Sequence, residues 1–346
     1  MTIKTQRLLA RAKKIAKKGE HEEAQKLYTT ILEASPDNQE AKNGLLALEQ
    51  SKDKLSPPNA EIQSVFEIYN NGQIQEALDS VETLTKDYPN EPLLYNISGA
   101  CYKEIGQLEE AFKNFEKAVD LKPEYAEARY NLGITLRELG QVDAAIKCYE
   151  DTLAIKHAYP NVHNNLGHIF LQLSQLDDAV DHFEWAVAYQ PDFVSAHNNL
   201  GNTFLTMGKL DDAVKSYEKT LTLKPDHAQA HNNLGIVFQK LGQLDSAVKS
   251  FNEAITIKPD YDKAHNNLGN AFKELGQLDA AVKSYEKALD VNPDYAEAHN
   301  NLGVTLKELG QLEDAVKSYK KALTLKPDYA EAINNLDIVL KELSSK

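Results

Sequence analysis

The stretch AEAHNNLGVTLKELGQLEDAVKSYKKALTLKPDY, at residues 296–329, decides the fold because the chain repeats it. Its NNLG segment recurs at a constant interval, at 198–201, 232–235, 266–269 and 300–303. The related segments NNLG at 164–167, YNLG at 130–133 and NNLD at 334–337 keep the same frame. The prolines that close the copies are Pro89, Pro123, Pro191, Pro225, Pro259, Pro293 and Pro327; one step fails, where His157 stands in place of a proline. An internal period of about 34 residues indicates a repeat protein.

Each copy has the pattern of two helices joined by a tight turn. We expect the first helix of residues 296–329 to run from about Ala296 to Leu309, with Asp294 as its N-cap and Glu297 completing a capping box. Gly310 would end this helix in the left-handed conformation. The second helix would end before Pro327, because proline cannot continue a helix.

A glycine recurs in the middle of the first helix, where it costs about 1 kcal/mol relative to alanine. Such a glycine calls for a packing reason. The second helix carries a recurrent alanine, such as Ala315, and a recurrent aromatic residue, such as Tyr319. We therefore expect the two helices to approach each other closely at the glycine, and the aromatic side chains to fill the space between units.

This pattern resembles the tetratricopeptide repeat, which has Leu-Gly and then an aromatic residue in its first helix, a glycine turn, Ala, Tyr or Phe, and Ala in its second helix, and a final proline. The resemblance covers residues 58–346, and residues 5–38 match it more loosely, with Gly19, Ala24, Tyr28 and Pro36 in frame. It implies an all-α fold, an α-solenoid in which antiparallel helix pairs form a right-handed superhelix and the first helices line a concave groove. The chain is also similar to the tetratricopeptide arm of O-linked N-acetylglucosamine transferases.

The repeat frame predicts four segments. Residues 1–50 are expected to form a degenerate helical module, residues 51–57 a linker, and residues 330–346 a capping helix in which Asp337 replaces the recurrent glycine. Between them we expect eight units: 58–91, 92–125, 126–159, 160–193, 194–227, 228–261, 262–295 and 296–329.

Composition narrows the classes of partner. The formal net charge of the 346-residue chain is −14, and residues beyond 54 carry 27 Lys and Arg against 44 Asp and Glu. An acidic body repels phosphate backbones, so we expect no nucleic-acid partner. The sequence has no apolar run long enough for a membrane helix. Two cysteines, Cys101 and Cys148, cannot form a disulfide framework or a metal cluster, and the N-terminal stretch lacks the features of a secretory signal. A cytoplasmic protein is predicted.

The candidate binding residues lie on one face of the first helix. Counted from the first residue of each unit, positions 2, 5, 9, 12 and 13 share a face on a helical wheel. The amides of this face are Asn164, Asn198, Asn232, Asn266 and Asn300 at position 5, and Asn202 and Asn270 at position 9. Its charges balance, with Lys263 among the cations. We predict that this face lines the groove.

Position 6 adds an unbroken asparagine series: Asn131, Asn165, Asn199, Asn233, Asn267, Asn301 and Asn335. Each amide can donate and accept hydrogen bonds. A ladder with one amide per repeat could clamp the backbone of an extended peptide without reading its sequence, as the similar ladder does in O-linked N-acetylglucosamine transferases. The alternative is that these asparagines only bond neighbouring helices together.

Other recurrent polar residues favour structural roles. One histidine recurs in each of five repeats: His163, His197, His231, His265 and His299. Histidines that are one repeat apart cannot converge on a metal ion, so we expect them to pack. Neither a metal nor a cofactor is predicted. The carboxylate clamp of tetratricopeptide co-chaperones is matched only in part, by Asn202, Asn233 and Lys263. Asn198 and Asn267 stand where that family has cations. The unit 160–193 diverges most, with Ser174 at the turn glycine and the single tryptophan, Trp185.

Three functional hypotheses follow. The first is a non-enzymatic scaffold that binds an extended peptide or a partner helix in the groove. The second is the substrate-docking arm of a glycosyltransferase or sulfotransferase system, against which the expected cap at 330–346 argues. The third is self-association through the basic N-terminal helices. The alternative is that their basic residues only form a solvated face of a degenerate repeat. No nucleophile–base pair or phosphate-binding loop supports an enzyme.

Overall fold

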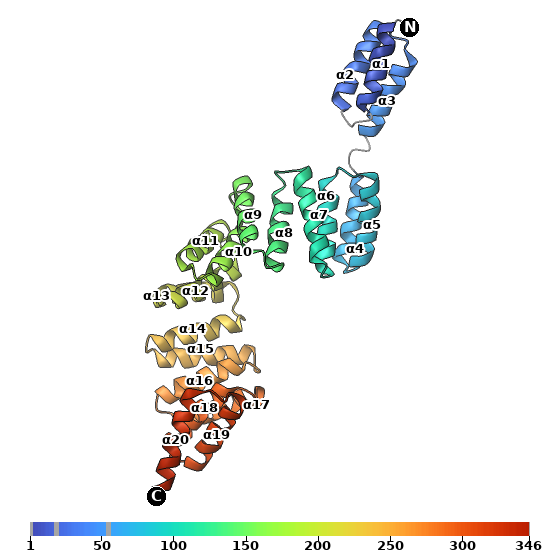
Figure 1. The fold of residues 1–346 in the computed structure, drawn as a ribbon. Helices are drawn as coiled ribbons and strands as arrows, with labels where there is room; N and C mark the ends of the chain where they lie inside the picture. The colour runs from blue at the N-terminus through green and yellow to red at the C-terminus, as the bar shows by residue number, and fades with distance from the viewer. Residues whose placement is uncertain (1–2, 17–20, 53–56, 346) are drawn as a thin grey trace. The chain divides into compact units, whose positions relative to one another are not determined.

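The computed structural model describes residues 3–16, 21–52 and 57–345, and within these ranges it contains twenty α-helices and no strand (Figure 1). The helices are α1 (Ile3–Ala16), α2 (His21–Ala34), α3 (Gln39–Lys52), α4 (Asn59–Asn70), α5 (Ile74–Asp87), α6 (Pro92–Glu104), α7 (Leu108–Leu121), α8 (Ala126–Glu138), α9 (Val142–Ile155), α10 (Pro160–Gln172), α11 (Leu176–Tyr189), α12 (Val194–Met207), α13 (Leu210–Leu223), α14 (Ala228–Lys240), α15 (Leu244–Ile257), α16 (Asp262–Glu274), α17 (Leu278–Val291), α18 (Ala296–Glu308), α19 (Leu312–Leu325) and α20 (Ala330–Ser344). The all-α class with paired antiparallel helices is confirmed.

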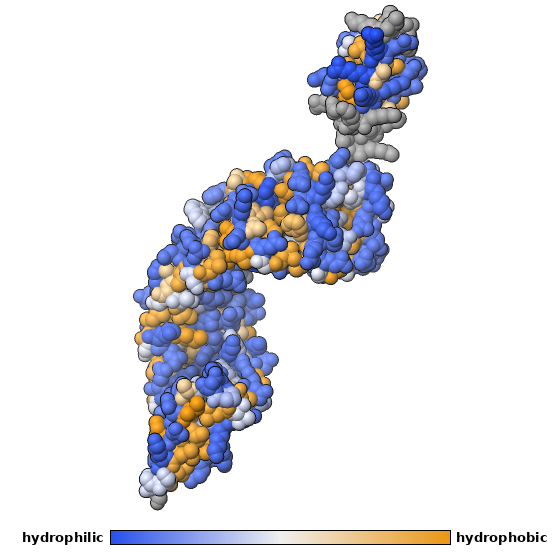
Figure 2. All heavy atoms as spheres, in the orientation of Figure 1, coloured by the Kyte–Doolittle hydropathy of each residue, from blue (hydrophilic) through white to orange (hydrophobic). Residues whose placement is uncertain are grey.

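Two compact units divide the chain, Met1–His157 and Ala158–Lys346. The division falls at the one irregular step of the repeat, where His157 replaces the proline. From α6 to α20 the first helix of each pair, called helix A below, begins at the same position of every repeat, and the second is called helix B. Figure 2 shows hydrophilic and hydrophobic residues interspersed over the visible face, with hydrophobic ones gathered around α8 and α9.

The linker expected at 51–57 falls only partly within the described residues. Helix α3 continues through Lys52, so Ser51 and Lys52 are helical where a linker was predicted. Residues 53–56 lie outside the described part of the chain, and Pro57 is buried. Hydropathy and proline content marked the segment as irregular, but they could not locate the end of the helix before it.

The recurrent glycine of helix A lies directly against the ring of helix B. A Cβ added to Gly235 would lie 2.6 Å from Cε1 of Phe251, and one added to Gly269 would lie 2.6 Å from Cε1 of Tyr285. Both rings are fully buried. The predicted close approach is therefore confirmed, but each ring packs on the glycine of its own pair rather than only between units. Neighbouring pairs then share one core, as where Phe183, Tyr217 and Leu234 belong to one cluster.

The capping box predicted for the helix at 296–308 is wrong. Tyr295, not Asp294, is the N-cap of α18, and no side chain caps this end. The backbone N–H of Tyr295 donates to the carbonyl of Asn292 at 3.2 Å. Asp294 therefore lies inside the turn that this bond closes, before the helix begins. Local motif matching missed this turn because it assumes that the helix starts right after the acidic residue.

Ser174 occupies a turn position that seven glycines fill in other pairs. Its φ is 61°, and it is the sole positive-φ residue other than glycine among the described residues; Gly208 has φ 73° at the equivalent turn. A side chain in this region costs about 1 kcal/mol. We therefore expect Ser174→Gly to raise the free energy of unfolding by about 1 kcal/mol in urea titrations.

The reverse change, Gly208→Ser, is the matched control, and it should lower the free energy of unfolding by a similar amount. Equal effects of the two substitutions, in sign and size, would contradict a conformational cause. Neither residue is a candidate binding residue, so the pair isolates the backbone term.

A helix that crosses a bilayer is long and predominantly apolar, and the described helices were found to differ from this type. None of them combines the length and the apolar character that a membrane crossing needs.

Candidate interaction surface

Helices A of successive pairs contact each other within each unit. In the second unit α10 contacts α12, α12 contacts α14, α14 contacts α16, α16 contacts α18, and α18 contacts α20. In the first unit α6 contacts α8. Equivalent positions of neighbouring helices A therefore lie side by side, and their side chains form a continuous surface, called the helix A face below.

Within each unit, hydrogen bonds join the two asparagine series into a ladder. The Nδ2 of the position-6 asparagine donates to Oδ1 of the position-5 asparagine of the preceding pair. The pairs are Asn131 to Asn96 (3.0 Å), Asn199 to Asn164 (3.1 Å), Asn267 to Asn232 (3.0 Å), Asn301 to Asn266 (3.1 Å) and Asn335 to Asn300 (3.2 Å). The ladder thus holds neighbouring helices A in register, as one of the two interpretations of the sequence expected.

The asparagines at position 5 are less exposed to solvent than the helical wheel predicted. The exposed fractions of Asn198, Asn232, Asn266 and Asn300 are 7%, 4%, 5% and 0%. The wheel treats a helix alone, whereas the next helix A covers this position and places its own asparagine over it. Position 6, from Asn131 to Asn335, is partly buried. The more accessible of the two series is therefore the one that lay beside the predicted face.

The position-9 asparagines are held from beneath by tyrosines of helix B. The hydroxyl of Tyr217 donates to Oδ1 of Asn202 at 2.7 Å, and that of Tyr285 donates to Oδ1 of Asn270 at 2.7 Å. Asn233 also donates to Asn202 (2.9 Å) instead of to Asn198, whose buried Oδ1 has no partner within the described residues. The sequence could have predicted these tyrosine–asparagine bonds, because Asn202 and Asn270 each precede a helix B tyrosine by the same spacing.

These tyrosine hydroxyls provide a stability test. Tyr285→Phe should lower the free energy of unfolding by about 1 kcal/mol, because Asn270 loses its donor. The buried hydroxyl of Tyr319 has no partner in the described chain, so Tyr319→Phe should leave the value unchanged or raise it. Urea unfolding of the two variants checks the difference. A loss of equal size in both would show that the phenol–asparagine bond contributes nothing specific.

Part of the side-chain amide remains available at Asn267 and at Asn301. The Nδ2 groups of Asn267 and Asn301 each use one N–H in the ladder, and no bond to their Oδ1 atoms is formed by the described residues. An amide has two N–H donors and an oxygen with two lone pairs. One donor and one acceptor at each of these positions are therefore left for a ligand along this surface.

The first unit contains a pocket on its helix A face. It has a volume of about 330 Å³ and lies between α4, α6 and α8. We call it the α4–α6–α8 pocket; its lining residues are Phe66, Tyr69, Asn96, Ile97, Ala100, Lys103, Glu104, Phe115, Glu127 and Asn131. Of the predicted groove residues it contains Asn131. The others were missed, although the small Ala100 at position 9, where other pairs carry Ile134 or Asn202, was a signal for open space.

The sequence that forms most of these helix pairs matches a protein family. A family model described as the C-terminal domain of cilia and flagella-associated protein 70 matches residues 125–335, more than half of the chain. The chain belongs to this family. A model described as TPR repeat, the tetratricopeptide repeat, matches residues 99–139 of this family member.

Curated relatives match short stretches of this family member. The peroxisomal targeting signal receptor of Saccharomyces cerevisiae is 32% identical over 85 residues, which are 24% of this chain and 14% of the receptor. The receptor of Candida glabrata is 34% identical over 64 residues, 18% of this chain and 11% of the receptor. The matched stretch therefore spans only a small part of the length of these relatives.

Two solved structures are also similar to this family member. The crystal structure of YrrB, described as a TPR protein with an unusual peptide-binding site, has a TM-score of 0.46 and 21% identity, covering 54% of this chain and 96% of that chain. The crystal structure of MamA has a TM-score of 0.45 and 26% identity, covering 48% of this chain and 97% of that chain.

The recurrent histidines fasten the loop before each helix A. The Nε2 atoms of His197, His231, His265 and His299 donate to the carbonyls of Pro191, Pro225, Pro259 and Pro293 at 2.9 to 3.0 Å. Their expected structural role is thus a specific hydrogen bond to the loop. His163 differs, since its Nδ1 lies 3.1 Å from Nδ1 of His182. No group of metal-ligating side chains occurs in the described ranges.

Several histidines should make stability depend on pH. Burial lowers the pKa of His182, His197, His227 and His299 below the ordinary imidazole value. The unfolded chain then binds protons more readily than the folded chain, so the free energy of unfolding should fall as pH drops through about 6.5. Urea titrations between pH 7.5 and 5 measure this. Replacing the four residues by glutamine should flatten the slope, and an unchanged slope would contradict the assignment.

The most divergent pair, α10–α11, carries an aromatic cluster. Trp185 is 47% exposed and stacks on Tyr189 with ring centroids 5.6 Å apart. His163 contacts the same rings and His182. These side chains explain each other's packing, and nothing among them points to a ligand.

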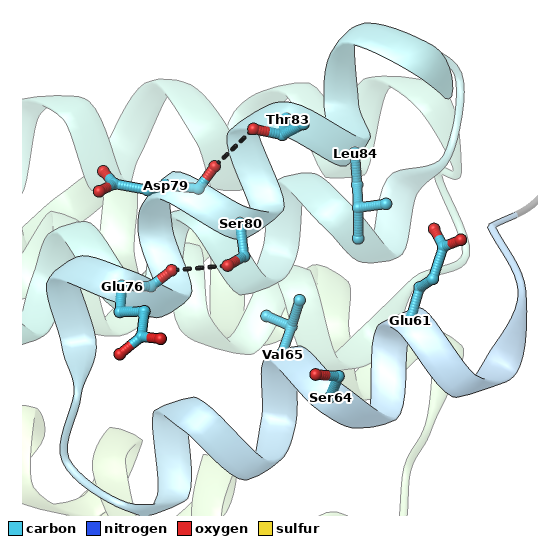
Figure 3. Close-up of a pocket in the computed structure, with 8 residues that line it drawn as sticks. All are labelled: Glu61, Ser64, Val65, Glu76, Asp79, Ser80, Thr83 and Leu84. Carbon is cyan, nitrogen blue, oxygen red and sulfur yellow. Dashed lines mark hydrogen bonds between the residues drawn. The ribbon is translucent and has the colours of Figure 1, made fainter.

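A second hollow, at the α4–α5 pair, has a volume of about 490 Å³. Figure 3 shows Val65 and Leu84 pointing into it, with Glu61 and Glu76 on either side. The hydroxyls of Ser80 and Thr83 donate to the carbonyls of Glu76 and Asp79 at 2.8 and 2.9 Å. The hydroxyls of Ser80 and Thr83 are therefore engaged within α5, and this hollow lacks the amide ladder of the helix A face.

The basic N-terminal helices form part of their own module. Arg11 pairs with Glu23 at 3.1 Å, and Lys13 pairs with Glu40 at 2.5 Å. These are exposed ion pairs, which contribute little energy. Lys17 and Lys18, which the self-association hypothesis also used, lie outside the described residues. The observed pairs fit a solvated face within the module.

Proposed function

We propose that this chain is a scaffold that binds an extended segment of a partner protein along its helix A face. The observation that carries the proposal is the asparagine ladder, whose position-6 amides at Asn267 and Asn301 keep a donor and an acceptor for a ligand. Together with Asn199 they would contact the backbone of the bound segment in the second unit, and Asn165 and Asn233 belong to the same series. The buried position-5 asparagines would fix their orientation.

Backbone recognition has a clear physical basis here. An extended peptide presents an N–H and a carbonyl at every residue, and each must find a partner when water is removed. Amides held in place by the ladder lose little rotamer freedom on binding, which reduces the entropic cost of association. Recognition of this kind selects an extended backbone rather than a particular sequence.

The proposal also includes the catalytic role and the cellular compartment of the chain. Membership of a repeat family supports a role in binding proteins rather than in catalysis, and we propose that the chain carries no catalytic site. We also propose a reducing, cytoplasmic setting, which two buried free cysteines support. The name of the family, cilia and flagella-associated protein 70, supports an association with cilia or flagella within that setting.

Cysteine protection tests the binding face. Lys240 and Lys263 are exposed on helices A, and Lys283 is exposed on helix B of α17. Each would be replaced singly by cysteine and labelled with a maleimide. Burial raises the pKa of Cys101 and of Cys148 to about 11, so these native thiols react slowly because little thiolate is present.

The probe is a degenerate library of capped nonapeptides. We expect it to slow labelling of Lys240→Cys and Lys263→Cys but not of Lys283→Cys. An N-methylated library of the same composition cannot donate backbone hydrogen bonds and should protect none of them. Equal protection at all three cysteines, or equal protection by both libraries, would overturn the proposal.

A further inference from the structure

The α4–α6–α8 pocket has the size and lining of a site for a single side chain. Its volume of about 330 Å³ is at the lower end of the range of ligand pockets. It opens on the helix A face of the first unit, where the bond from Asn131 to Asn96 forms part of its wall. A segment bound along this face would pass over the pocket.

Apolar groups form the floor of this pocket. Ile97 and Phe115 are buried, with exposed fractions of 3% and 0%, and Ala100, which also lines the pocket, adds little bulk. Phe66 is 36% exposed, although it is a large apolar residue. An aliphatic chain that covered Phe66 and lay over Ala100 would gain about 25 cal/mol for each Å² of apolar surface removed from water.

The rim of the pocket is acidic. Glu104 and Glu127 are exposed lining residues. The single lining cation, Lys103, has its ammonium 3.9 Å from the carboxylate of Glu138, which offsets its charge. The acidic rim also acts on the phenols nearby: the pKa of Tyr69 is raised by burial and then by Glu104, and that of Tyr125 is raised to about 12 by burial and then by Glu127.

We propose that the α4–α6–α8 pocket selects an arginine or lysine side chain of a segment bound along the helix A face of the first unit; this inference rests on the function proposed above. The aliphatic stem lies on the apolar floor, and the cationic head meets Glu104 and Glu127 at the rim, an arrangement that long basic side chains commonly adopt. Aromatic faces at Phe66 and Tyr69 add a cation–π contribution. The negative charge of the chain beyond residue 54 draws such segments towards it.

Other side chains fit less well. A leucine or phenylalanine would cover the floor but leave both carboxylates without a partner, and a glutamate would meet like charge at the rim. An arginine isostere without charge, citrulline, keeps the length and the polar head of arginine. It therefore separates the charge at the rim from the shape of the pocket.

The test uses capped nonapeptide libraries in which the central residue is fixed and the others are degenerate. The fixed residues are arginine, lysine, citrulline, leucine and glutamate, and binding to the full chain is measured by fluorescence anisotropy. We expect arginine and lysine libraries to bind about fivefold more tightly than the citrulline library, the ratio for two partly exposed ion pairs. The preference should shrink as salt is raised.

Variants assign the preference to the pocket. The double variant Glu104→Gln/Glu127→Gln should lose the preference for basic residues. The matched control is Glu116→Gln/Asp120→Asn, which removes two exposed carboxylates from α7 outside the pocket and should keep it. Circular dichroism melting curves verify that both variants are folded.

The possible outcomes distinguish an error in the pocket assignment from an error in the proposed function. Equal loss in both double variants, or a leucine library that binds as tightly as the arginine library, overturns the pocket assignment while peptide binding stands. Failure of every library to bind overturns the proposed function and this inference with it.

Discussion

Phe251→Ala is expected to lower the free energy of unfolding of the second unit by about 3 to 5 kcal/mol, the cost of removing a buried aromatic ring. The ring of Phe251 is fully buried and shares a cluster with Leu268 and Ala271 of the next helix A. Its loss leaves a cavity between two pairs, and a solenoid has no distant core that could compensate. Urea unfolding followed by circular dichroism measures the change.

Ile257→Ala is the matched control for this prediction. Ile257 lies on the same helix, α15, but is 36% exposed, so its truncation should cost far less. Comparable losses from the two truncations would contradict a core organised around the helix B rings.

Gly235→Leu is expected to lower the free energy of unfolding by about 2 to 3 kcal/mol through overpacking. An added Cβ alone would lie 2.6 Å from Cε1 of Phe251, and that ring has no exposed surface through which to move away. The clash outweighs the gain of about 1 kcal/mol in helix propensity that comes from replacing glycine. The same urea titration measures the effect.

The equivalent position of α20 supplies the control. Asp337 is exposed and stands where the other helices A carry glycine, so Asp337→Leu should cost little. Combining Gly235→Leu with Phe251→Ala should cost less than the sum of the two, because the leucine fills the space of the ring. Strict additivity of the two substitutions would show that they do not share one contact.

Most of the fold could be predicted from the sequence because the repeat frame is regular. The glycine, the ring and the turn residue of each pair are set by contacts within a single repeat, and these were predicted. The N-cap at Tyr295 was not, because the turn before it depends on which backbone groups bond around Pro293. The end of α3 was missed because a helix of ordinary composition can run into a segment that otherwise looks irregular.

The binding face was only partly predictable. A helical wheel places Asn232 correctly on its own helix, but it contains no information on the neighbouring helix that buries it. Residues of α4, α6, α7 and α8 line the α4–α6–α8 pocket, so no single repeat contains it. The ladder itself was visible as a series, whereas its bonds to the adjacent series depend on the tilt between neighbouring helices.

The ladder can be observed directly in the side-chain amide region of ¹H–¹⁵N spectra of the deuterated chain. We predict that the degenerate nonapeptide library shifts the Nδ2 resonances of Asn267 and Asn301, that the N-methylated library does not, and that amides on helices B stay in place. Unchanged Asn267 and Asn301 resonances under saturating peptide, or shifts confined to helices B, would contradict binding along the helix A face.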